Sequence, residues 1–423
     1  MKKFGVLFGT FFLVALFAAP AAAVDYPEAP DIKTDIVLTT NKRVEGAIAR
    51  DNCFGITIMV GKNEVKVPHQ VIVAAYYQKA NNDAYAAGMT AYAAKNWAEA
   101  LGNFQGATPG DISEDALKKS FMDRVSYLRG VCAYHLGDFA LAEKSLKDAS
   151  RRDDAVYKAE AEYYLARMEE AKGAYDKAQS KYHALTVATY KKMKDDGAAI
   201  DKWDYLARLG MGRAKVLALA PKAGQDDNMK KAEEEFQKIF QEGKANEEQF
   251  KKTGKGVRFF EDDVLLCDVQ VKACALKYLA KKSPDNYQKL VETLKQPLRD
   301  AQVANDKSAL AWMYLDRADC YFGMMEKESD AAKKKEYGED ALMDYLRVTM
   351  IYSLGPVDLA RAYYRTGVIL EQLQLADWES RALQAYRRAT SPTYKATPTY
   401  DAAKKAREEL EKKTAAKDGK DKK

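Results

Sequence analysis

The residues that most often carry catalysis or hold a metal are sparse in this chain. Its 423 residues include three histidines, His69, His135 and His183, and none stands in an HExxH, Cys-x-x-Cys or two-histidine-plus-carboxylate spacing. Those spacings bring metal ligands together, so the sequence gives no support to a zinc or iron site, and we expect no metal. His69, which follows Pro68, is expected to be an ordinary surface residue.

The sequence motifs that bind phosphate or position a catalytic nucleophile are incomplete or absent. Gly210-Met211-Gly212 lacks the third glycine of a dinucleotide site and has no strand pattern before it. Residues 251–256, KKTGKG, do not have the GxxxxGK[ST] order of a phosphate loop, and no GxSxG elbow occurs. The sequence therefore predicts a protein that is not an enzyme and needs no cofactor.

The net charge of +6 belongs to the two ends of the chain. Lys2 and Lys3 stand in an N-terminal stretch without acidic residues, and the rest of the excess lies from Ala402 onward. Because basic and acidic residues balance in between, the sequence does not indicate the basic face that nucleic-acid binding requires. The basic tail could make only a weak, salt-sensitive contact with an anionic wall polymer or a membrane.

The N-terminus has the three parts of a secretory signal peptide. A dibasic start is followed by an apolar stretch from Phe4 to Ala19, then by Pro20 and three alanines that end at Ala23. We predict a signal peptide over 1–23, with an uncleaved anchor as the alternative, and a linker over 24–34. The mature protein is expected in the periplasm or outside the cell, and soluble, because no later segment approaches 18 apolar residues.

The cysteines do not form a pattern typical of a disulfide-stapled domain. They are five in number and irregularly spaced, at Cys53, Cys132, Cys267, Cys274 and Cys320. In an exported protein, unpaired thiols would be open to oxidation unless they were covered. We therefore expect these cysteines to be buried as small apolar side chains.

Residues 35–77 have the texture of short β-strands. Five segments rich in β-branched residues are separated by glycine, asparagine or proline, and so few residues in five strands favour a small closed barrel. The pattern resembles the Sm-like and Src-homology-type small barrels, with Gly46 as the central glycine of the second strand. That resemblance implies a module that binds peptides, glycans or RNA, or that serves only for docking.

From residue 78 to 400 the chain is predicted to be helical, with a repeated spacing. A small residue precedes an alanine by twelve positions in three places, Gly88 and Ala100, Gly130 and Ala142, and Ala166 and Ala178. Small residues let paired helices approach closely, and the large residue four positions after each alanine is expected to fill the gap to the next unit. The pattern resembles the tetratricopeptide repeat, which implies a mainly α fold in which six or seven helix pairs stack into a right-handed α-solenoid.

More degenerate second helices follow downstream, and the array ends near its last prolines. Their apolar positions are Ala232 and Phe236, Ala341 and Tyr345, and Ala382 and Tyr386, the last pair after a first helix with Gly367. Residues 328–336 are interpreted as a charged insert. Residues 401–423 are predicted to be a charged flexible tail with one short helix.

Tyrosines recur seven positions apart in the predicted first helices. The candidates for partner binding are Tyr85 and Tyr92, Tyr127 and Tyr134, Tyr163, and Tyr314 and Tyr321. In the repeat family such positions tend to face the concave groove where extended peptides bind. Tyrosine suits a binding surface because it offers a large contact area and a polar tip. The same rings could instead be core between the units, and the sequence leaves both alternatives open.

These observations favour a non-enzymatic scaffold of the cell envelope. Its partner would be a protein or peptide on the concave face of the helical array. Met89 and Val131 stand where some relatives of this repeat type carry the residues that clamp a free C-terminus. The alternative is a protein that binds peptidoglycan or another wall glycan through the small barrel and the basic tail.

Overall fold

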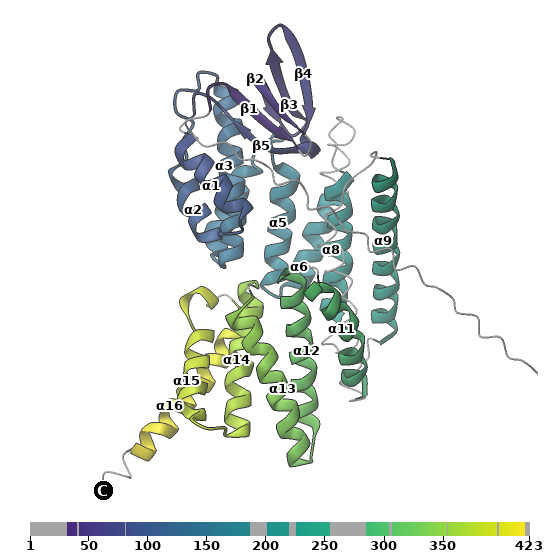
Figure 1. Cartoon of the computed structure of the whole chain (residues 1–423), viewed down its shortest axis with the longest axis vertical. Helices are drawn as coiled ribbons and strands as arrows, with labels where there is room; N and C mark the ends of the chain where they lie inside the picture. The colour runs from purple at the N-terminus through teal and green to yellow at the C-terminus, as the bar shows by residue number, and fades with distance from the viewer. Residues whose placement is uncertain are drawn as a thin grey trace, which may run out of the picture.

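The computed structural model describes residues 32–39, 42–80, 82–186, 201–219, 226–253, 285–303, 307–352, 354–395 and 397–418. In these residues a small sheet stands at one end of a largely helical molecule (Figure 1). The predicted signal peptide and most of the predicted linker lie outside the described residues, as do Cys267 and Cys274.

The helices of the N-terminal half follow one another as antiparallel neighbours. They are α1 (Asn82–Ala93), α2 (Trp97–Gly106), α3 (Asp115–Leu136), α4 (Phe139–Ala149), α5 (Lys158–Ala171), α6 (Tyr175–Ala184), α8 (Asp201–Leu219) and α9 (Asp226–Thr253). Local sequence sets their limits: Gly137 ends α3 in the left-handed conformation, with φ of 79°. The side chain of Asp138 then begins α4 by accepting a hydrogen bond of 3.0 Å from the Leu141 amide.

The helices of the C-terminal half form the lower part of the molecule in Figure 1. They are α11 (Asp285–Val303), α12 (Lys307–Lys327), α13 (Ala331–Met350), α14 (Pro356–Leu373), α15 (Trp378–Ala389) and α16 (Tyr400–Asp418), with a 3₁₀ turn, η4 (Pro392–Tyr394), before α16. Asp330 caps α13 by accepting a hydrogen bond from the Lys333 amide. Most of the predicted insert at 328–336 is therefore the first turns of a helix, and that prediction was wrong.

Helices pair through glycines that face large side chains, as the repeated spacing predicts. A Cβ atom added to Gly88 of α1 would lie 2.6 Å from the Phe104 ring of α2, and one added to Gly130 of α3 would lie 2.6 Å from Leu146 of α4. The alanine four positions before each large residue, Ala100 or Ala142, is fully buried. In both pairs the large residue fills the space within its own pair, where we had expected it between units.

Consecutive pairs lie against one another through neighbouring helices. Contacts join α2 to α3, α4 to α5, α6 to α8, α11 to α12 and α13 to α14. Some first helices also contact the next first helix: α3 contacts α5, and α5 contacts α8. Here the first helices are α1, α3, α5, α8, α12 and α14. The buried residues fall into two connected clusters in the N-terminal half and one in the C-terminal half.

The two halves approach each other at a turn. The left-handed Gly137 at the α3–α4 turn lies so close to Pro356, the first residue of α14, that an added Cβ would be 2.9 Å from the proline side chain. Gly173, at the α5–α6 turn, similarly faces Pro398. The turns of the second and third pairs are thus in contact with the C-terminal half.

The sheet has the five predicted strands, all antiparallel to their neighbours. They are β1 (Asp35–Thr39), β2 (Arg43–Asn52), β3 (Gly55–Val60), β4 (Asn63–Pro68) and β5 (Ile72–Tyr76), with a 3₁₀ turn, η2 (His69–Val71), between the last two. Their order across the sheet is β4-β3-β2-β1-β5. The outer strands β4 and β5 do not pair, so the sheet is open and the prediction of a closed barrel was wrong.

The open sheet buries its apolar side against helices instead of against itself. Ile36, Ile56 and Ile58 are almost fully buried and belong to the same cluster as Phe121 and Val125 of α3. In Figure 1 the sheet lies across the upper ends of α1, α3 and α5. Because these helices already cover the apolar side, burying it does not require closure of the sheet.

The end of the chain is more ordered than predicted. In place of a flexible tail from residue 401, α16 runs from Tyr400 to Asp418 and lies against α15. Leu410 is 1% exposed and Ala403 is fully buried. The lysine-rich composition hid this apolar contact, because two well-placed residues are enough to dock a short amphipathic helix.

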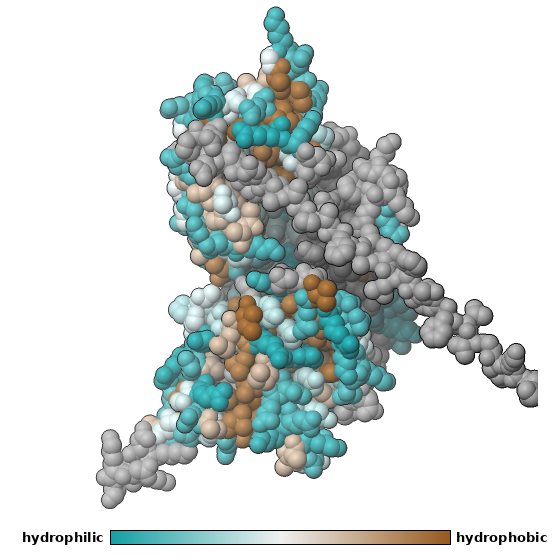
Figure 2. All heavy atoms as spheres, in the orientation of Figure 1, coloured by the Kyte–Doolittle hydropathy of each residue, from teal (hydrophilic) through white to brown (hydrophobic). Residues whose placement is uncertain are grey.

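No helix in the described part of the chain is apolar over a length that would cross a bilayer. The surface view in Figure 2 is mostly hydrophilic, with hydrophobic strips over the C-terminal half. Exposed apolar residues on α13 include Met343, Met350 and Ile351.

Candidate partner-binding site

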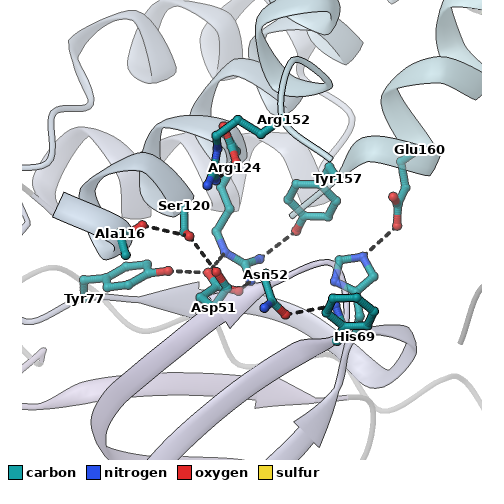
Figure 3. Close-up of polar contacts among 12 residues, drawn as sticks. Asp51, Asn52, His69, Tyr77, Ala116, Ser120, Arg124, Arg152, Tyr157 and Glu160 are labelled. Atoms are coloured by element: carbon teal, nitrogen blue, oxygen red, sulfur yellow. Dashed lines mark hydrogen bonds and ion pairs between the residues drawn. The ribbon is translucent and has the colours of Figure 1, made fainter. Parts of the chain in front are cut away.

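A buried ion pair joins the sheet to the helices (Figure 3). Arg124 of α3 donates from Nε and Nη2 to the two carboxylate oxygens of Asp51 in β2, both at 2.7 Å, and both side chains are fully buried. Arg124 also donates from Nη1 to the Tyr157 hydroxyl at 2.9 Å, and the Tyr77 hydroxyl donates to Asp51. Each charge is met by several hydrogen bonds, which a buried ion pair needs to offset its desolvation.

A second polar contact lies beside this pair and corrects one prediction. His69 is 10% exposed at its side chain, and its Nε2 lies 2.7 Å from Glu160 Oε1 of α5. The ring also meets the Tyr157 ring edge-on at 5.3 Å. His69 is therefore a buried contact between the sheet and α5, and the prediction of a surface residue was wrong.

The junction formed by Asp51, His69, Tyr77, Arg124 and Glu160 orients the sheet on the helices. Burial, followed by the charge of Asp51, raises the pKa of Tyr77 well above its usual value, so its hydroxyl keeps its proton. Every carboxylate oxygen of Asp51 is already occupied by a donor. These groups are therefore positioned to dock the sheet on α3 and α5.

The cysteines of the described residues lack the surroundings of reactive thiols. Cys53, Cys132 and Cys320 are buried, which confirms the prediction for the three cysteines in the described residues. Burial raises the pKa of Cys53 to about 11 and that of Cys132 to about 12. Both thiols therefore stay protonated and unreactive at neutral pH.

Four of the seven candidate tyrosines lie in the core. The exposed fractions are 1% for Tyr85, 7% for Tyr127, 7% for Tyr163 and 5% for Tyr314. Tyr85, for example, packs between Tyr76 of the sheet and Phe121 of α3. For these four tyrosines, the structure therefore agrees with the alternative in which the rings are part of the core.

The other three candidates, Tyr92, Tyr134 and Tyr321, are only partly buried. Tyr92 and Tyr134 stand near the C-terminal ends of α1 and α3, whereas Tyr321 lies in α12 of the other half. The structure thus brings Tyr92 and Tyr134 into one region and leaves Tyr321 apart from them.

A continuous series of partly exposed aromatic side chains runs through this region. Tyr92 meets Trp97 edge-on at 5.3 Å, and Trp97 stacks on His135 at 4.2 Å. Tyr134, which precedes His135 in the sequence, meets Tyr164 of α5 with 5.6 Å between the ring centroids. We call the surface formed by Tyr92, Trp97, Tyr134, His135 and Tyr164 the aromatic face.

The aromatic face continues toward α8 and includes a basic residue. Trp203 of α8, also partly exposed, lies 5.5 Å from Tyr163. Arg167, one turn after Tyr163 in α5, donates from Nη1 to its hydroxyl at 3.2 Å and sits over its ring at 6.0 Å. Large flat rings and a guanidinium group thus line four consecutive first helices.

His135 is held neutral on this face. Burial, together with the positive charges of Arg167 and Lys95, lowers the pKa of His135 from 6.5 to about 4. The ring is therefore an uncharged stacking partner for Trp97 at neutral pH.

Sequence reasoning missed Trp97, His135, Tyr164 and Arg167. For Tyr164 a signal was present, since Tyr157 and Tyr164 are seven positions apart, like the pairs in α1 and α3. Tyr157 precedes α5 and stacks on Tyr127 at 4.3 Å. Trp97 and His135 carry no such signal, because their contact joins α2 to α3 and depends on tertiary packing.

In the C-terminal half, charged residues surround the candidate Tyr314. The guanidinium groups of Arg317 and Arg347 lie over its ring, 5.3 Å and 5.1 Å from the ring centroid. Both arginines form ion pairs with Asp344. Nearby, Asp319 accepts from Arg365 at 2.6 Å and from the Tyr345 hydroxyl at 2.7 Å. These arginines are neutralised by carboxylates, which is typical of a structural network.

Within the described ranges, no group of three or more histidine, cysteine, aspartate or glutamate side chains is placed to hold a metal ion. Comparison with models of known protein families gave no match, and comparison with curated proteins gave no significantly similar relative.

Proposed function

We propose that this chain is a non-enzymatic scaffold of the cell envelope that binds protein partners on the aromatic face. The helix pairs would form a right-handed solenoid of the tetratricopeptide type, with first helices on its concave side. The observation that carries the proposal is the run of partly exposed rings across α1, α2, α3 and α5. Export rests on the signal-like residues 1–23.

The aromatic face is suited to binding because little conformational entropy of its side chains would be lost when a partner binds. Stacking and edge-on contacts already fix the Trp97, His135, Tyr134 and Tyr164 rings, so a partner would not need to immobilise them. Tyrosine and tryptophan dominate the energetics of many protein interfaces. The junction between the sheet and the helices is buried, and the arginines around Tyr314 are paired with carboxylates. Neither group offers a binding surface comparable to the aromatic face.

Substitution of the two exposed tyrosines tests the proposal. We expect the double variant Tyr92→Ala, Tyr134→Ala to lose recovery of its envelope partners in a pull-down by roughly tenfold or more, because two anchors of the interface are removed. The control is Tyr337→Ala, which removes a partly buried tyrosine from the second helix α13. Circular dichroism establishes that both variants are folded.

Full recovery of the same partners by the folded double variant would contradict the proposal. Loss of recovery by Tyr337→Ala alone would place the binding surface on the C-terminal half and would contradict it as well.

A further inference from the structure

Arg167, which is partly buried, differs from Arg124 and Arg213, the two most deeply buried arginines of the N-terminal half. Arg124 is paired with Asp51, and Arg213 of α8 is paired through Nε and Nη2 with Glu170. Arg167 makes one hydrogen bond, to the Tyr163 hydroxyl, and no carboxylate of the described residues lies within ion-pair distance of it. A half-buried guanidinium group without a counter-charge is costly, because burial weakens its hydration.

The nearest acid is already engaged elsewhere. Glu170 lies one turn after Arg167, and its two oxygens accept from Arg213 at 2.7 and 2.8 Å and from the Tyr182 hydroxyl at 3.1 Å. On the other side of Arg167 the charges are positive. His135 is affected by the charges of both Arg167 and Lys95, which lower its pKa. Arg167 and Arg213 thus share the single negative charge of Glu170, and of the two only Arg213 is hydrogen-bonded to it, which leaves one positive charge in excess among these three residues.

We propose that Arg167 receives a carboxylate from an acidic side chain of the partner, which lies as an extended polypeptide across the aromatic face. This inference rests on the proposed function, since it names the chemistry of the partner at that same surface. Arg167 supplies the charge, and Tyr134 and Tyr164 supply contact area for the residues on either side of the acid.

A carboxylate fits this place better than a phosphate group. One guanidinium group matches a single negative charge, and its planar donors suit the two oxygens of a carboxylate. A phosphate dianion would favour further cationic donors, as in arginine clusters or helix N-termini. On the described part of the face, Arg167 lies among tyrosine hydroxyls and the neutral His135.

The experiment measures binding of a defined acidic peptide to the full chain. The probe is fluorescein-labelled octaglutamate with an amidated C-terminus, compared with octaglutamine of the same form, and binding is followed by fluorescence anisotropy. We expect octaglutamate to bind and octaglutamine to bind about tenfold more weakly or less. Arg167→Gln should weaken octaglutamate binding by about tenfold or more, because charge-assisted hydrogen bonds are lost.

Two further variants separate the local site from the net charge. Arg381→Gln removes an exposed arginine of α15 and should leave octaglutamate binding within about twofold of the wild type. Arg167→Lys keeps the charge but not the planar fork, and should restore part of the affinity. Circular dichroism and thermal unfolding establish that the Arg167 variants remain folded.

Equal binding of octaglutamate to the wild type and to folded Arg167→Gln would overturn the inference, as would equal weakening by Arg381→Gln. Binding only of a peptide with a free C-terminus would overturn the assignment to an acidic side chain. Partner recovery that is lost in the tyrosine double variant but kept in Arg167→Gln would contradict this inference alone. Recovery that persists in the double variant would contradict the proposed function.

Discussion

Arg124 and Arg167 stand on neighbouring first helices, and their surroundings assign them different tasks. Arg124 donates from each of its three guanidinium nitrogens to Asp51 or Tyr157 in the interior, so it fixes the sheet on α3. Among the described residues, Arg167 makes one hydrogen bond, to a tyrosine hydroxyl, and it stands beside partly exposed rings. At the residue scale, the count of partners therefore separates the structural arginine from the one available for binding.

The stacked His135 gives a prediction on pH. Its pKa is about 4 in the folded chain and 6.5 when unfolded, so the unfolded state takes up a proton between these values while the folded state does not. The free energy of unfolding should therefore fall as pH is lowered from 6.5 to 4. His135→Phe, which preserves a ring on Trp97, should remove this part of the slope.

The measurement is chemical unfolding at several pH values, with His183→Gln as the control. His183 is exposed at the end of α6, and its removal should leave the slope unchanged. A slope between pH 4 and 6.5 that is the same in His135→Phe as in the wild type would show that His135 titrates normally.

At the scale of the element, close approach of α1 and α2 depends on Gly88. Gly88→Ala should lower the free energy of unfolding by about 1–3 kcal/mol, because its Cβ would lie 2.6 Å from the Phe104 ring. Gly102 offers a matched control in α2, since an added Cβ there meets nothing within 4 Å. Gly102→Ala should raise the free energy of unfolding by about 0.5–1 kcal/mol through helix propensity.

Urea unfolding followed by circular dichroism measures both changes. If Gly88→Ala proved as stable as Gly102→Ala, the helices of the pair would not be in the close contact that the structure shows.

The sequence predicted those elements whose signals are local. The five strands and the close approach of paired helices at small residues follow from period and spacing, as at Gly88. Closure of the sheet could not be judged, because it depends on the packing of the sheet against helices such as α3, which contacts β2. The docked α16 was missed because the burial of Leu410 depends on tertiary packing of α16 against α15.

The candidate site was predictable only in part. Spacing identified Tyr92 and Tyr134 but could not separate them from the buried Tyr85, because the same seven-residue interval holds for core and surface. Arg167 had no signal at all in the sequence. Its significance comes from the absence of a nearby free carboxylate in the described chain, which only the tertiary structure reveals.

At the scale of the whole molecule, the proposed binding surface lies where several parts meet. The sheet is locked to α3 and α5 from one end, and the α3–α4 turn approaches α14 of the C-terminal half at Pro356. The aromatic face lies on the helices between these two contacts. Such bracing favours a preformed surface over one that is ordered by the partner.

Site-specific photo-crosslinking in cells tests the central claim most directly. A photoreactive phenylalanine analogue is placed in turn at Tyr134 on the aromatic face, at the exposed Met122 elsewhere on α3, and at the exposed Phe54 in the sheet. The account predicts covalent adducts with envelope proteins from position 134 and few from the other two. Adducts that form from position 54 or 122 and not from 134 would contradict it.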